Sequence, residues 1–103
     1  MATLFAPIFE IPAQLQQYTN LADARIGAKV LECSDEFFAE ANRMLQFDAP
    51  IFVEDKFDDH GKWMDGWETR RKRHAGYDWA IIELGVSGQI NALDIDTTFF
   101  SGN

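Results

Sequence analysis

The chain has 103 residues, 47% hydrophobic and 25% charged, which fits one modest globular domain and excludes a disordered or fibrous protein. Its net charge of −8 argues against general nucleic-acid binding, because phosphate groups would be repelled on average. No apolar run reaches the length of a transmembrane helix. Residues 1–12 carry no Lys or Arg, unlike a signal peptide, so the cytoplasm is the expected location.

The first third of the chain predicts an arm, a turn and a strand. Residues 1–18 are apolar but aperiodic and are interrupted by two prolines, which favours an arm lying on a partner surface. Asn20 is a candidate cap for a short helical turn that Gly27 ends. Residues 29–33 then read as a strand whose single cysteine, Cys33, we expect to be a buried, inert thiol.

A second short helix is expected over residues 36–45, capped by Ser34 or Asp35. Its apolar residues fall near i, i+4 and i+7 spacing, which gives one apolar face. Residues 51–53, after a proline, predict a short strand.

Residues 54–76 show neither a helical nor a strand period, and loops of that length are usually functional or disordered. Order returns at residues 77–84, where aromatic and β-branched residues predict a central strand. Glycines at 85 and 88 indicate a turn, and residues 89–95 predict a second strand, so we expect the two strands to form an antiparallel pair.

The irregular segment carries most of the candidate chemistry. Residues 56–73 hold six of the nine basic residues of an otherwise acidic chain. Guanidinium groups bind carboxylate or ureido oxygens in a bidentate manner, and carboxylates can act as a base or orient arginines. We therefore expect catalysis from Asp65 and Glu68, and substrate binding by Lys62, Trp63, Trp67, Arg70 and Arg71.

Structural explanations of the same residues stay open. The run Arg70–Arg73 can pair with the acids at 54, 55, 58 and 59, or match a nucleic-acid patch by chance, and the tryptophans can be core residues. His60 and His74 match no compact ligand spacing, although two histidines with a carboxylate can bind a metal. Asp94 and Asp96 share one strand face, where they bind a cation or accept loop amides. The residues require no cofactor, and a divalent metal stays compatible with them.

The segment 62–68, Lys-Trp-Met-Asp-Gly-Trp-Glu, followed by the basic run at 70–73, resembles the signature stretch of the allantoicase family. The resemblance covers nearly all of the chain after residue 18, including the stretches 20–22, 27–31, 34–39, 76–82, 94–97 and 100–103. Phe99 stands where many members of that family carry His.

The resemblance implies an all-β, jelly-roll β-sandwich of the galactose-binding type, with one or two short helices. It divides the chain into an arm, 1–18, and a domain, 19–103, that is only part of the first of two modules. It also implies hydrolysis of allantoate to ureidoglycolate and urea by a homo-oligomer, without nucleic-acid or membrane partners. The alternative is a non-catalytic binding or self-association module of the same fold.

Overall fold

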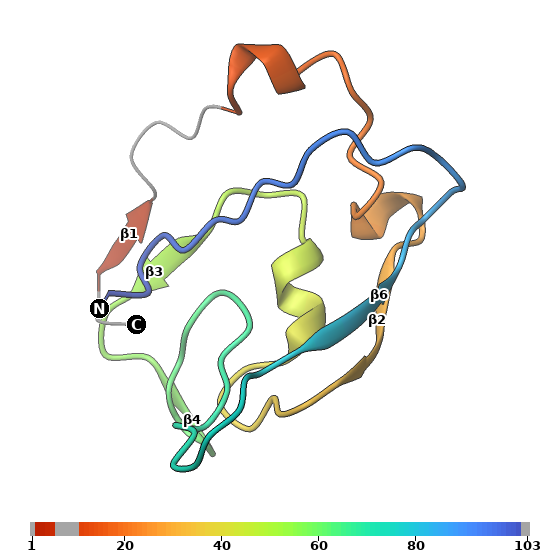
Figure 1. Cartoon of the computed structure of the whole chain (residues 1–103). Helices are drawn as coiled ribbons and strands as arrows, with labels where there is room; N and C mark the ends of the chain where they lie inside the picture. Colours follow the sequence, from red (N-terminus) through yellow and green to blue (C-terminus); the bar gives the residue numbers. More distant parts are fainter. Residues whose placement is uncertain (1, 6–10, 102–103) are drawn as a thin grey trace.

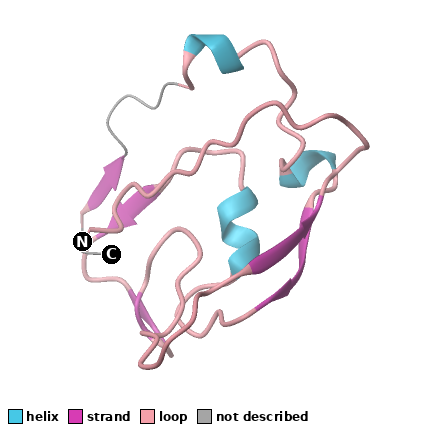
Figure 2. Cartoon of the chain, viewed as in Figure 1, coloured by secondary structure: helices cyan, strands magenta, loops and turns pink. Residues whose placement is uncertain are grey.

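The structure is a computed structural model that describes residues 2–5 and 11–101. Its strands are short and all pair antiparallel, in three separate two-stranded ladders (Figures 1 and 2). They are β1 (Thr3–Phe5), β2 (Lys29–Cys33), β3 (Ile51–Val53), β4 (Phe57–Asp58), β5 (Gly61–Lys62) and β6 (Ala80–Glu83). Three 3₁₀ turns complete the described elements: η1 (Ala13–Leu15), η2 (Ala24–Ile26) and η3 (Ala41–Leu45). The expected all-β class is confirmed.

The longest ladder joins β2 to β6, which lie far apart in the sequence. Val30 pairs with Ile82 and Cys33 pairs with Ala80, with a register shift between residues 30 and 32. The strand expected at 29–33 is confirmed, whereas the one expected at 77–84 is regular only from Ala80 to Glu83.

The expected strand over residues 89–95, and its pairing with residues 77–84, are wrong. The glycines read as a turn serve close packing instead. A Cβ on Gly85 would lie 2.6 Å from Cγ1 of Ile26, and one on Gly88 would lie 2.9 Å from Cδ1 of Leu21. The Gly85 amide also donates to the Leu21 carbonyl at 2.9 Å. The chain after β6 is therefore held against residues 21–26 and cannot fold back on β6.

The expected helix over residues 36–45 is also wrong for its first half. The amides of Phe38 and Ala39 donate to the carbonyl of Glu68, at 3.2 and 3.1 Å, so this stretch pairs across the chain. Only η3 is helical, and it begins where the Glu36 carboxylate accepts the Ala41 amide at 2.9 Å. The long-range pairing overrides the local helical pattern.

Two further predictions concern the strand at 51–53 and the turn before residue 29. The expected strand at 51–53 is confirmed as β3, and its partner is β1, which lies within the stretch expected to be an arm. The turn before β2 exists as η2, but Asp23 rather than Asn20 caps it, accepting the Arg25 amide at 2.8 Å. Gly27 ends it with a φ of 103°, a conformation that favours glycine.

The apolar core of the described residues is small. Its buried members are Ala28, Ala41, Leu45, Val53 and Trp63. The segment after β6 crosses the molecule to the neighbourhood of β3 (Figure 1), where the ring of Phe99 lies 5.8 Å from that of Phe52. Along this segment Leu93 and Ile95 are 80% and 81% exposed, so much apolar surface has no cover within the described residues.

We predict that Leu45→Ala lowers the free energy of unfolding by about 2–5 kcal/mol, because it opens a cavity in a core with few other buried members. The neighbouring Met44, which is 38% exposed, provides the control, and Met44→Ala should change stability by less than about 1 kcal/mol. Urea titration measures both. Equal losses would contradict the assignment of the core to this face of η3.

Candidate functional site

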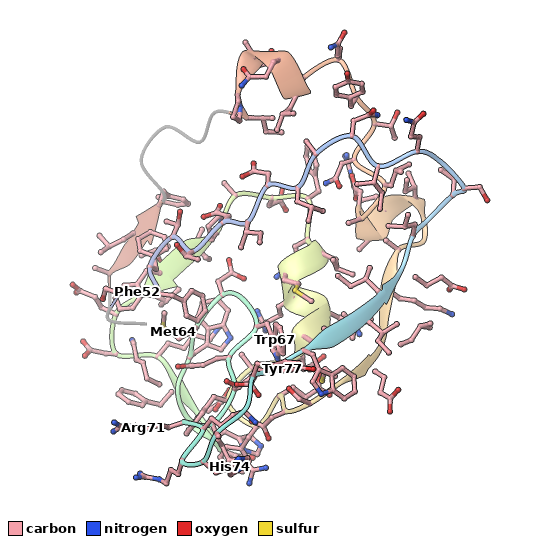
Figure 3. All side chains as sticks on the ribbon, viewed as in Figure 1. Phe52, Met64, Trp67, Arg71, His74 and Tyr77 are labelled. Atoms are coloured by element: carbon pink, nitrogen blue, oxygen red, sulfur yellow. The ribbon has the colours of Figure 1, made fainter. Side chains whose placement is uncertain are left out.

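The basic segment expected to form one site divides into two halves. Figure 3 shows Phe52 and Met64 near β3, whereas Arg71 and His74 lie at the lower end of the molecule. The first half packs on β3: Lys62 Nζ donates to the Val53 carbonyl at 2.7 Å. Trp63 is 9% exposed, and the Lys56 ammonium lies 4.0 Å from its ring centroid.

Asp65 belongs to this packed half and joins η3 to β3. One of its oxygens accepts from Gln46 Nε2 at 3.1 Å and lies 3.5 Å from an Arg43 guanidinium nitrogen. The other accepts the Ile51 amide at 2.9 Å. Both oxygens are thus engaged by the protein's own donors, a pattern typical of a structural carboxylate.

Trp67 and Arg70 meet at Asp35, the second residue after β2. The indole Nε1 of Trp67 donates to the Asp35 carbonyl at 2.7 Å. The Asp35 carboxylate accepts the Arg70 amide at 2.7 Å, and its other oxygen accepts Nε and Nη2 of Arg70 at 3.0 and 2.7 Å. These bonds from Arg70 hold the pKa of Asp35 below its ordinary value.

Glu68 lies between these two residues and is half-buried. Its backbone forms an antiparallel bridge with Ala39. Burial away from water raises the pKa of its carboxyl group, because desolvation disfavours the charged form. In the described part of the chain its carboxylate accepts no hydrogen bond from a protein donor, which leaves it available for a proton or a ligand.

A cleft of about 650 Å³ opens on the second half of the segment. One wall is the run of basic residues, and the facing residues come from the end of β2 and the start of the segment leading into β6. The lining residues are Ser34, Asp35, Phe38, Arg70, Arg71, Lys72, Arg73, His74 and Asp78. Of the expected site residues, the cleft therefore includes Arg70 and Arg71, and its lining leaves out Lys62, Trp63, Asp65, Trp67 and Glu68.

Asp78 lines this cleft, although its place in the sequence does not mark it as a site residue. Its carboxylate accepts from Ser34 Oγ at 2.9 Å and from Thr69 Oγ1 at 3.2 Å. Lys72 Nζ lies 3.7 Å from the same carboxylate. Ser34 and Asp35, expected to cap a helix, instead follow β2 directly. Two polar residues at the end of a strand are the one signal in the sequence for a site there.

The metal expectations find no support in the geometry. Within residues 2–5 and 11–101 no three His, Cys, Asp or Glu side chains are grouped to hold an ion. His60 stacks edge-on against Phe37 at 4.5 Å. Asp96 accepts the amide of Thr98 at 2.8 Å, and the strand expected to align it with Asp94 does not form. In the same residues no helix has the length and apolar character needed to cross a bilayer.

The chain is a small all-β protein with a cationic cleft. Its similarity to known proteins identifies its family. The allantoicase repeat matches residues 19–103, so the chain belongs to the allantoicase family. A probable allantoicase of Acinetobacter baumannii is 82% identical over all 103 residues, and a probable allantoicase of Burkholderia mallei is 55% identical over 92 residues. The crystal structure of allantoicase from Saccharomyces cerevisiae matches 66% of this chain and 19% of its own at 40% identity and a TM-score of 0.53.

The chain is short beside these relatives. It spans 31% of the length of the Acinetobacter baumannii relative and 27% of that of the Burkholderia mallei relative, although it is covered wholly or almost wholly itself. Family membership is therefore established for a segment that spans about a third of these relatives.

We predict that Asp65→Ala lowers the free energy of unfolding by about 1–3 kcal/mol, because it leaves the partly buried Ile51 amide without its acceptor. Asp59→Ala, a change at an exposed carboxylate of the same segment, is the control and should be nearly neutral. Thermal unfolding of both variants measures the difference. A neutral Asp65→Ala would contradict the structural role of this side chain.

Proposed function

We propose that this chain forms part of a hydrolase that converts allantoate into ureidoglycolate and urea. The carrying observation is the cleft beside Arg70–Arg73 in a chain of net charge −8. Allantoate is an anion with one carboxylate and two ureido groups, so cationic donors suit its carboxylate. A local positive region in an acidic protein also attracts such an anion selectively.

Arg70 and Arg71 both lie in the wall of the cleft. In this proposal Arg71 supplies positive charge to the substrate, and Arg70 holds the basic run in place through its bonds to Asp35. Glu68 does not line the cleft but lies two residues before Arg70 in the chain. It is the candidate for guiding water or moving a proton, because burial raises the pKa of its carboxyl group and no protein donor within the described residues bonds to it. Asp65 is the weaker candidate, since both of its oxygens are already engaged. Lys62, Trp63 and Trp67 then do not contact the substrate. They hold the backbone next to the cleft in place, Lys62 and Trp67 through bonds to backbone carbonyls.

The proposal also concerns the assembly. Each described ladder has two strands, so strand edges stay unpaired and apolar residues stay exposed within the described residues. We propose that further strands complete a jelly-roll domain and that whole proteins associate as homo-oligomers. The free thiol of Cys33 fits the reducing cytoplasm in which we place the protein.

The test is urea release from allantoate by this chain joined to the remaining two-thirds of the Acinetobacter baumannii relative. We predict that the joined protein is active and that its Glu68→Gln variant loses at least about 100-fold in kcat, with a small change in KM. Glu54→Gln, at an exposed carboxylate, is the control and should keep full activity. A folded but inactive joined protein would overturn the proposed function, and an unchanged Glu68→Gln would overturn the assigned base.

The second candidate is a non-catalytic, self-associating module, and the exposed Leu93 and Ile95 favour it. The two candidates differ in the size of the unmodified 103-residue chain in solution. Light scattering after size exclusion would show a discrete oligomer for the module, stable on dilution. A monomer, together with urea release by the joined protein, would exclude it.

A further inference from the structure

The four basic residues at the cleft are not equivalent, because two of them already have partners within the protein. Arg70 is bound to Asp35 through its amide and two guanidinium nitrogens. Lys72 lies 3.7 Å from the Asp78 carboxylate. Both acids also line the cleft, so their charges offset those of Arg70 and Lys72 at the place where a ligand would bind.

Arg71 and Arg73 alternate with this pair along the chain. Both are exposed and line the cleft, and within the described residues neither lies at ion-pair distance from a carboxylate. The cleft lining thus has four Lys or Arg and two Asp side chains, which leaves a formal surplus of two positive charges at neutral pH. Arg71 and Arg73 account for that surplus.

We infer that Arg71 and Arg73 together form the anion-binding pair of the cleft, and that they bind the carboxylate end of the ligand. This deepens the proposed function and rests on it for the identity of the substrate. Arg70, whose donors are directed at Asp35, keeps the basic run in place and contributes little to the anion. A planar guanidinium presents paired donors to a carboxylate, and two of them can fix both its position and its orientation.

Several bonds give the two arginines a fixed platform. Thr69 and Lys72 are both tied to Asp78, and Asp78 is tied to Ser34 at the end of β2. Ser34 in turn accepts the Trp79 amide at 3.0 Å and donates its own amide to the Trp79 carbonyl at 2.9 Å. The basic run is therefore anchored on both sides of Arg71, and binding loses less conformational freedom than it would on an unrestrained loop.

The test is titration calorimetry on the 103-residue chain with two probes, allantoate and malonate, a small dicarboxylate without ureido groups. We expect Arg71→Gln/Arg73→Gln to weaken the binding of both probes by roughly tenfold or more, with Tm nearly unchanged. Lys29→Gln/Lys56→Gln removes the same charge away from the cleft and should leave binding within about twofold. Arg70→Gln should lower Tm and weaken binding less than the double arginine variant does.

The outcomes separate this inference from the proposed function. Malonate binding that depends on Arg71 and Arg73, without allantoate binding, would support the anion-binding pair and count against the proposed substrate. Binding of neither probe, or binding that Arg70→Gln weakens more than the double variant, would overturn the inference. An equal loss in the Lys29→Gln/Lys56→Gln control would also overturn it, because net charge alone would then explain the effect.

Discussion

The arrangement of the site depends on one residue, Asp35, at the point where β2 ends. Its carbonyl accepts a hydrogen bond from the Trp67 indole, and its carboxylate accepts hydrogen bonds from three nitrogens of Arg70. These bonds, together with the Ala39–Glu68 bridge, hold residues 67–70 against residues 35–39. The position of Arg71 and Arg73 at the cleft, the burial of Glu68 and the non-helical backbone of residues 36–40 all follow from this junction.

The strands were predictable where the sequence concentrates apolar and β-branched residues. Residues 29–33, 51–53 and 80–83 form strands for that local reason. Their pairing was not predictable in the same way, since Gly85 and Gly88 have the composition of a turn but serve contact with Ile26 and Leu21. Likewise, residues 36–40 have a helical pattern, and only the bonds of Phe38 and Ala39 to the distant Glu68 show why they are not helical.

The residue types of the candidate site were predictable from the sequence. Its division into a half packed on β3 and a half that lines the cleft was not. The density of basic residues between 56 and 73 located the chemistry, and Arg70 and Arg71 line the cleft. The acids that offset Arg70 and Lys72 could not be identified, because Asp35 lies 35 positions from Arg70, and a single sequence carries no signal for that contact. The packed roles of Lys62, Trp63 and Asp65 depend on β3 and η3 in the same long-range way.

The most direct test of this account is a double-mutant cycle between Asp35 and Arg70. Because the bonded pair lowers the pKa of Asp35, its contribution to stability is present above the ordinary carboxyl pKa and is lost as pH falls through the lowered one. We predict that Asp35→Ala and Arg70→Ala show a coupling free energy of about 1 kcal/mol at neutral pH, which is lost at acidic pH as the Asp35 carboxylate is protonated. Additive effects at neutral pH would contradict the claim that this junction holds the site together.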